Sequence, residues 1–172
     1  MEKGKLYISC GVPGSGKTTY LNKIKKDDEV VISRDDIRYS ILKEGEDYFS
    51  HEDEVFNLFV KKITEAINSG INVYADATHL NRASRAKLTR AIKNANCTPS
   101  AIETIFFNVP LHICLERNNK REGTKAFVPK GVIKRMFFTL EPPSGEYSKG
   151  WVIDEKGEVS KIEEGEVLKK IL

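Results

Sequence analysis

The sequence is poor in cysteine and has no long apolar run. Cysteine occurs only at Cys10, Cys97 and Cys114, an odd number without C-x-x-C spacing, which argues against a disulfide framework and against a zinc site. No apolar run approaches the roughly 18 residues that a membrane-spanning helix needs, and the first residues do not form a signal-peptide pattern. We therefore expect a cytoplasmic protein without a membrane partner.

Repeats, low-complexity segments and metal-ligand clusters are also missing. Hydrophobic residues make up 40% and charged residues 31% of the chain, which is typical of a folded globular protein. A length of 172 residues suits a single domain over residues 1–172. The net charge of +3 is too small to prove a nucleic-acid partner. Lys and Arg nevertheless outnumber Glu between Asn81 and Arg135.

Short apolar runs alternate with segments of helical periodicity. The pattern predicts strands at 5–10, 30–32, 71–75 and 101–108, and helices at 17–26, 50–68, 81–95, from 110 onward and at 130–140. A capping-box pattern at 50–53 predicts that the second helix starts at Ser50. One further strand or hairpin is expected at about 150–163. Strands separated by helices predict an α/β fold, a three-layer α/β/α sandwich with a mainly parallel sheet.

The most specific motif is Gly-Val-Pro-Gly-Ser-Gly-Lys-Thr-Thr, which directly follows the first predicted strand. It fills the pattern G-x-x-x-x-G-K-[ST] of a phosphate-binding loop, in which glycines let backbone N–H groups turn toward a polyphosphate. Lys17 adds a positive charge for the β- and γ-phosphates, and the Thr18 hydroxyl is a ligand for Mg²⁺. We predict that ATP contacts the whole loop: Gly11, Val12, Pro13, Gly14, Ser15, Gly16, Lys17, Thr18 and Thr19.

Two carboxylates and two arginines follow the second predicted strand. A kinase that acts on a hydroxyl needs a carboxylate to orient that hydroxyl and accept its proton, and Asp35 or Asp36 can supply it. Arg34 and Arg38 flank the pair and can bind an anionic acceptor. The alternative is that the acidic residues cap a helix and the arginines are their solvated partners.

The third predicted strand delivers Asp76, Ala77, Thr78 and His79. Asp76 stands where a carboxylate that organises Mg²⁺ is expected, although an acid there can also simply end a strand. We place Asp76 and Thr78, together with Arg34 and Arg38, on the acceptor side of the site. His79 could contact the substrate or simply begin a turn, and we interpret it as the start of a turn.

Residues 117–125 are basic and have no apolar periodicity, which predicts a lid over about 117–135. Arginines that close over a transferring phosphoryl group stabilise its transition state, an effect of about 10³ or more in rate. Arg117 and Arg121 are four residues apart and are expected to share one helix face. The alternative is an ordinary solvated loop.

Three segments resemble the 5′-kinase domain of the bacteriophage-type polynucleotide kinases. They are Gly-Val-Pro-Gly-Ser-Gly-Lys-Thr-Thr, Ser-Arg-Asp-Asp-Ile-Arg and Glu-Arg-Asn-Asn-Lys-Arg-Glu-Gly-Thr-Lys-Ala-Phe-Val-Pro, within a similarity from about 5 to 144. The resemblance implies a phosphate-binding-loop kinase with a helical lid, which uses ATP and Mg²⁺ to phosphorylate the 5′-hydroxyl end of DNA or RNA.

The same resemblance assigns roles to single residues. Lys17 and Thr18 would hold the ATP phosphates and Mg²⁺, and Asp35 would be the general base. Arg38 would contact a phosphate of the acceptor strand and Arg121 the transferring phosphate, although Glu122 departs from the Arg-Gly-Thr-Lys usual in the family. No Asp-x-Asp-Gly-Thr motif is present, so we expect kinase activity without 3′-phosphatase activity.

Two other functions fit the loop. A small-molecule kinase of the same fold would enclose its acceptor in a pocket, whereas a polynucleotide kinase would line a groove with Arg38 and the basic helix near 81–90. A nucleotide-dependent switch or binding protein would turn Asp35 away from the phosphates.

Overall fold

A mixed six-stranded sheet forms the middle layer of the protein, in a computed structural model that describes residues 2–171. The strands are β1 (Leu6–Cys10), β2 (Val30–Ser33), β3 (Val73–Asp76), β4 (Ile102–Phe107), β5 (Lys149–Ile153) and β6 (Val159–Lys161), in the spatial order β2-β3-β1-β4-β5-β6. The first five run parallel, and β6 pairs antiparallel with β5. β5 and β6 form a hairpin at about the position where the sequence predicts one further strand or hairpin.

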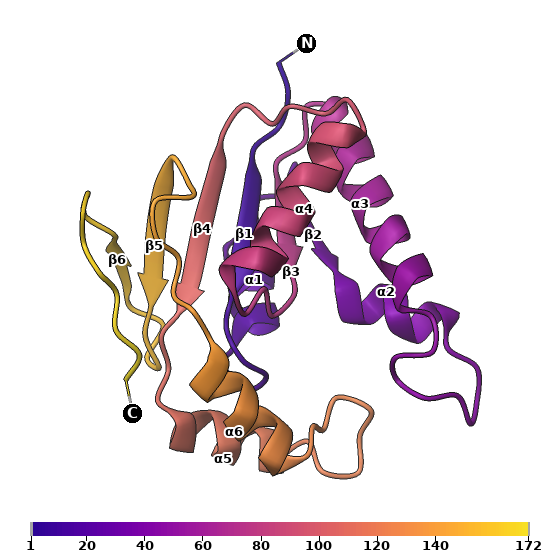
Figure 1. Ribbon diagram of the computed structural model, residues 1–172, viewed down its shortest axis with the longest axis vertical. Coiled ribbons are helices and arrows are strands. Elements are labelled where there is room, and N and C mark those ends of the chain that lie inside the picture. The colour runs from indigo at the N-terminus through magenta and orange to yellow at the C-terminus, as the bar shows by residue number, and fades with distance from the viewer. Residues whose placement is uncertain (1, 172) are drawn as a thin grey trace.

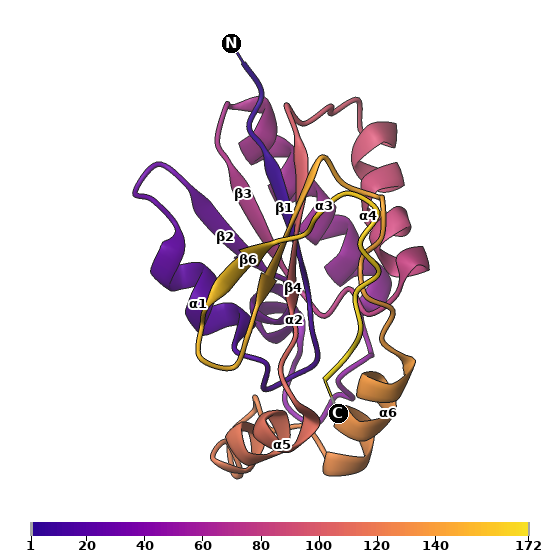
Figure 2. The same cartoon turned by 90° about the vertical axis from the view of Figure 1, so that its left-hand side faces the viewer.

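Helices cover both faces of this sheet (Figures 1 and 2). They are α1 (Lys17–Ile24), α2 (Arg34–Ile41), α3 (Glu52–Asn68), α4 (Arg82–Asn94), α5 (Leu111–Asn119) and α6 (Lys130–Thr139). Figure 2 shows α1 on one face and α3 and α4 on the other, with α5 and α6 near the carboxyl ends of the strands. The three-layer α/β/α fold with a mainly parallel sheet is therefore confirmed.

The side chains of each strand point alternately to the two faces of the sheet and so pack against different helices. Leu6 and Ile8 of β1 are buried against α3 and α4, whereas Tyr7 between them faces the α1 side, since neighbouring residues of a strand point to opposite faces. On the α1 side the rings of Tyr7 and Tyr74 stack with centroids 4.4 Å apart. Both faces of the sheet are covered, which explains the almost continuous apolar runs of its central strands.

Two local predictions were wrong. The helix predicted to start at Ser50 is α3, and Ser50 does not cap it. This helix begins at Glu52, its N-cap is His51, and the Ser50 hydroxyl donates to the Asp47 carbonyl oxygen at 2.7 Å. Arg117 and Arg121 do not share a helix face, because α5 ends at Asn119 and Arg121 lies in the following turn. By contrast, the Asn81 cap of α4 is present, with the Ser84 N–H donating to the Asn81 side-chain oxygen at 2.8 Å.

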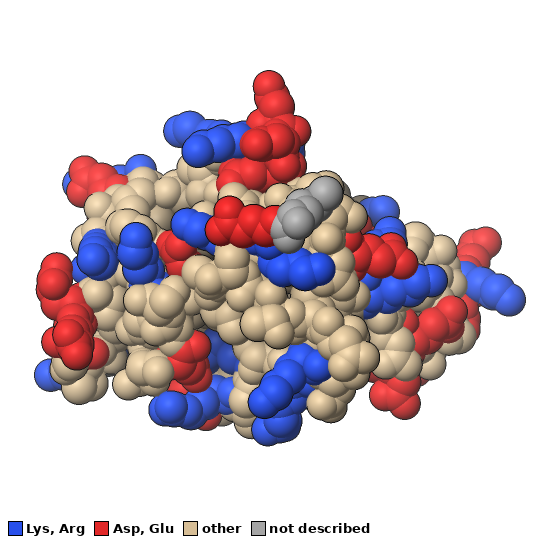
Figure 3. Space-filling view, turned by 90° about the horizontal axis from the view of Figure 1, so that it is seen from above, with Lys and Arg blue, Asp and Glu red and all other residues tan. Residues whose placement is uncertain are grey.

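The end of the molecule at the amino ends of the strands carries interspersed positive and negative side chains (Figure 3). It shows no large patch of one sign of the kind that marks a nucleic-acid surface. Within residues 2–171, no helix combines the length and the apolar character needed to cross a membrane.

Candidate functional site

Residues 11–16 form a tight loop between β1 and α1 at the carboxyl end of the sheet. Gly14 and Gly16 have φ of 84° and 91°, a left-handed conformation that glycine adopts without strain. A Cβ on Gly14 would lie 2.4 Å from the carbonyl oxygen of Cys114 in α5. Glycine is required at position 14 both for the turn and for the close approach of α5.

The loop leaves several donors without protein acceptors. The first turn of α1 has no side-chain cap, so its N–H groups remain open to an anion. The buried Ser15 hydroxyl has no hydrogen-bond partner among the described residues. Lys17 donates to the carbonyl oxygen of Val12 at 3.0 Å. Burial lowers the pKa of the Lys17 ammonium, an effect that Asp76 and Asp35 oppose. Such a loop is built for a polyphosphate.

Thr18 and Asp76 form the part of the site suited to a divalent cation. The Thr18 hydroxyl donates to Asp76 at 2.7 Å, and Asp76 is the last residue of β3 and only 4% exposed. Burial raises the pKa of this carboxyl, and the nearby Lys17 ammonium counteracts the rise. Within residues 2–171 no three His, Cys, Asp or Glu side chains gather as a metal cluster. The pair instead suits Mg²⁺, which binds few protein oxygens and keeps waters and phosphate ligands.

Asp35 lies in the first turn of α2, directly after β2. The helix is capped by Ser33, whose hydroxyl accepts from the Asp36 N–H at 3.2 Å. The Asp35 carboxylate accepts from the Arg38 guanidinium and from the Tyr48 hydroxyl, and its side chain is 54% exposed. The carboxylate is thus held by two donors and still open to solvent, as a group that meets an acceptor must be.

Glu52, which the sequence analysis did not identify, anchors the arginines of α2. Arg38 donates to its two carboxylate oxygens at 2.6 and 2.9 Å, and Arg34 donates to one of them at 3.3 Å. The Arg38 side chain is only 6% exposed. Its hydrogen bonds hold the pKa of Glu52 below the usual range. Arg38 therefore lies beside Asp35, as expected, but as part of a buried ion-pair network.

The spacing of Arg34 and Arg38 was the available signal for this network. Residues four apart share one face of a helix, and two arginines on a buried face require carboxylate partners. Nothing in the sequence singles out Glu52 from its neighbours Asp53 and Glu54. The partner becomes evident only when α2 packs on α3.

The predicted lid consists of the end of α5, a turn and the start of α6. Arg117 lies in the last turn of α5, where its guanidinium donates to the carbonyl oxygens of Gly14 at 3.5 Å and Glu155 at 2.8 Å. Arg121 is half-buried, and its side chain makes no ion pair within the described part of the chain. The Tyr39 hydroxyl donates to the Lys125 carbonyl oxygen at 3.0 Å. The structure thus brings Arg117 to the phosphate-binding loop and Lys125 to α2.

Thr78, His79 and Arg85 make contacts within the protein. The backbone carbonyl of Thr78 accepts from the Gly11 N–H at 3.0 Å. His79 is buried, bonds the Ser9 carbonyl at 2.8 Å, and burial lowers its pKa to about 4. Arg85 of α4 is 3% exposed and pairs with Glu146. It therefore does not line a groove with Arg38.

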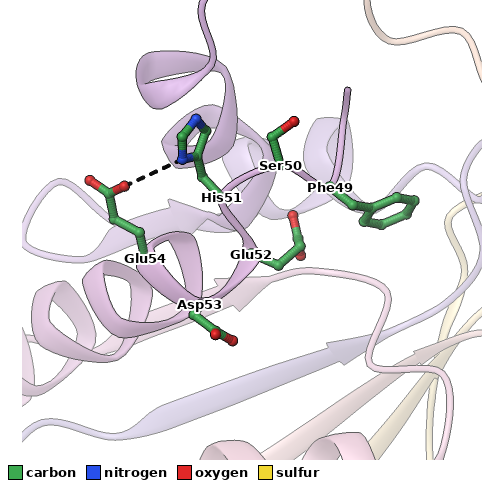
Figure 4. Close-up of a pocket in the computed structure, with 6 residues that line it drawn as sticks. All are labelled: Phe49, Ser50, His51, Glu52, Asp53 and Glu54. Carbon is green, nitrogen blue, oxygen red and sulfur yellow. Dashed lines mark ion pairs between the residues drawn. The ribbon is translucent and has the colours of Figure 1, made fainter. Parts of the chain in front are cut away.

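A shallow cavity lies at the start of α3, with Glu52 among the residues that line it (Figure 4). It has a volume of about 370 Å³ and is lined by Phe49, Ser50, His51, Glu52, Asp53 and Glu54. Its carboxylates would repel a phosphate, and they stand where acidic side chains stabilise the start of a helix. The cavity is consequently not the nucleotide site.

Two known proteins are similar to most of this chain. A protein of Autographa californica nuclear polyhedrosis virus, provisionally named a bifunctional polynucleotide kinase/RNA ligase, is 27% identical over 157 residues, which cover 83% of this chain and 22% of the viral protein. A chain in the structure of the Pnkp1/Rnl/Hen1 RNA repair complex is 25% identical with a TM-score of 0.69, over 81% of this chain and 45% of that one.

The chain spans less than half the length of both relatives. A gluconokinase from Sinorhizobium meliloti shares the fold at 22% identity and a TM-score of 0.59, over 90% of this chain and 84% of its own. The resemblance to polynucleotide kinases is confirmed. Residues 6–143 match the family model described as "AAA domain", and this chain, with its nucleotide-binding phosphate loop and kinase-like fold, belongs to that family.

Proposed function

We propose that the protein is an ATP- and Mg²⁺-dependent kinase that transfers the γ-phosphate to the 5′-hydroxyl end of DNA or RNA. The observation that carries the proposal is the position of Asp35. Its carboxylate is half-exposed, backed by Arg38, and close enough to Lys17 to oppose the lowering of the Lys17 pKa by burial. A proton acceptor for a hydroxyl thus stands beside a phosphate-binding loop, as transfer to an alcohol requires.

The loop residues fit the triphosphate of ATP. The uncapped N–H groups of α1, the unpartnered Ser15 hydroxyl and the Lys17 ammonium are the donors for its phosphates. Thr18 and Asp76 are the residues that would hold Mg²⁺, which neutralises phosphate charge when bound. Arg121, with no ion-pair partner in residues 2–171, is the lid residue free to reach a transferring phosphate.

Asp35 is the proposed general base. It would accept the proton of the acceptor hydroxyl as the new oxygen–phosphorus bond forms. Arg34 and Arg38 are the proposed ligands of an acceptor phosphate. A guanidinium has five N–H donors, and Arg38 uses four of them within the protein, so one remains for the phosphate. The similarity of this chain to the viral protein, which is named as a polynucleotide kinase, supports this choice of acceptor.

Transfer of labelled phosphate from ATP to a 5′-hydroxyl oligonucleotide tests the proposal. The wild type is expected to label the oligonucleotide, and Asp35→Asn is expected to lose about 10²–10⁴ in kcat. Asp36→Asn is the matched control, since the exposed Asp36 lies in the same helical turn. Absence of transfer by the wild type, or full activity of Asp35→Asn, would refute the proposal.

A salt titration addresses the polynucleotide character of the acceptor. Contacts with strand phosphates release counterions, so the oligonucleotide KM should rise steeply with salt. A small-molecule kinase is the second candidate, supported by the overlap with the gluconokinase fold over nearly its whole length. Phosphorylation of sugars or nucleosides with no oligonucleotide labelling would favour that candidate. Slow ATP hydrolysis that no acceptor changes would instead indicate a switch protein.

A further inference from the structure

Two aromatic side chains are exposed on the segment that joins α2 to α3. Tyr48 is 40% and Phe49 is 68% exposed. Isolated exposed apolar residues are common on protein surfaces. These two are distinguished by their place, because the Tyr48 hydroxyl donates directly to the Asp35 carboxylate. The rings therefore stand at the acceptor side of the proposed site.

The rings form a short ladder that leads away from Asp35. Tyr48 and Phe49 meet edge to face with centroids 4.7 Å apart, and Tyr39 meets Tyr48 edge to face at 6.5 Å. The Arg38 guanidinium lies 4.2 Å from the centre of the Tyr48 ring, so one face of that ring is already covered. Phe49, at 68% exposed, is the most exposed member of the ladder.

The charged side chains around the ladder differ in sign on its two sides, which would orient a bound nucleic-acid strand. Figure 4 shows the Phe49 ring directed away from Asp53 and Glu54, whose carboxylates would repel phosphates. On the other side of the ladder, the Lys125 ammonium lies 4.7 Å from the centre of the Tyr39 ring. A polyanion is therefore repelled on the α3 side and attracted on the lid side, with the aromatic rings between them.

We propose that Phe49, braced by Tyr48, is a stacking surface for one of the first two nucleobases of the acceptor strand. The inference rests on the proposed function and specifies how its site recognises the acceptor. Every nucleobase has an aromatic face, and a base stacked on an aromatic side chain is stabilised without being read by sequence. Phe49 would thus favour acceptors that carry bases over sugars and other small alcohols, and would accept DNA and RNA of many sequences.

The test compares two acceptors and three proteins. One acceptor is a 5′-hydroxyl oligonucleotide, and the other is the same strand with abasic residues at its first two positions. Base stacking of this kind corresponds to about 5- to 150-fold in affinity. Phe49→Ala is expected to raise the KM of the intact strand within that range, and to change the KM of the abasic strand little. Phe138→Ala, which removes another exposed phenylalanine from α6, is the matched control.

The outcomes distinguish a failure of the stacking role from a failure of the proposed function. If the wild type phosphorylates both strands and Phe49→Ala leaves the intact-strand KM unchanged, or raises both KM values equally, the stacking role is refuted and the kinase assignment stands. If the wild type labels neither strand but phosphorylates a metabolite, both are refuted. Unchanged urea unfolding of Phe49→Ala, expected from its exposed ring, confirms that the variant is folded.

Discussion

Replacing Glu52 by Gln probes the ion-pair network beneath Asp35. Gln keeps the size of the side chain and one carbonyl oxygen, but it removes the charge that balances Arg38. Breaking a fully buried ion pair costs about 3–5 kcal/mol because the remaining charge is left uncompensated. Glu52 is 27% exposed, and Asp35 still contacts Arg38 in the variant. Both facts reduce the penalty, and we expect a loss of about 2 kcal/mol in the free energy of unfolding.

Urea unfolding measures this loss. With a slope of roughly 1–3 kcal/mol per molar urea, the midpoint should fall by about 1 M. Glu54→Gln is the control, because Glu54 lies in the same helical turn and its side chain is 64% exposed. That variant should lose at most about 0.5 kcal/mol. Equal midpoints for the two variants would refute the argument that Glu52 balances a buried charge.

The same comparison has a pH signature. The pKa of Glu52 is lowered in the folded protein, mainly by its hydrogen bonds with Arg38. Its stabilisation is therefore complete above the unfolded pKa of about 4.3 and is lost as the pH falls through the lower folded value. The difference between wild type and Glu52→Gln should shrink in that acidic range. A difference that persists unchanged there would point to packing as the source of the effect.

Three further predictions concern other parts of the site. Arg117→Ala should raise the KM for ATP about tenfold by loosening the bonds to Gly14 and Glu155, and Arg135→Ala should not. Asp76→Asn should raise the Mg²⁺ concentration needed for half-maximal activity about 10- to 100-fold, and an unchanged requirement would remove Asp76 from the metal site. Burial lowers the pKa of His79 to about 4, so the unfolded chain takes up a proton at this residue before the folded protein does as the pH falls below about 6.5. The free energy of unfolding should therefore drop by about 1–3 kcal/mol toward pH 4. In urea unfolding, His79→Asn should show a smaller drop over the same pH range.

Local patterns predicted the donor half of the site well. The phosphate-binding loop is continuous in sequence, and its glycines and Lys17 act through backbone geometry that the motif itself determines. These features depend on residues that are neighbours in the chain.

The acceptor half depends on contacts between distant residues. Arg38 pairs with Glu52 across 14 positions, and Tyr48 reaches Asp35 across 13. A carboxylate at the start of a helix looks like a cap whether or not an arginine packs against it, so Glu52 could not be singled out. In the same way, Arg85 belongs to the basic helix that was expected to line a groove, and only packing reveals its pairing with Glu146.

The bond between Tyr39 and Lys125 links α2 to the turn between α5 and α6. One arm is α2, which begins beside Asp35, and the other is the turn between α5 and α6, which leads back to the phosphate-binding loop. One exposed hydrogen bond and one cation–π contact hold the arms together. Together they contribute about 1–2 kcal/mol. Under the function proposed above, this weak link is where the lid turn would separate from α2, which would widen the access of an acceptor to Asp35.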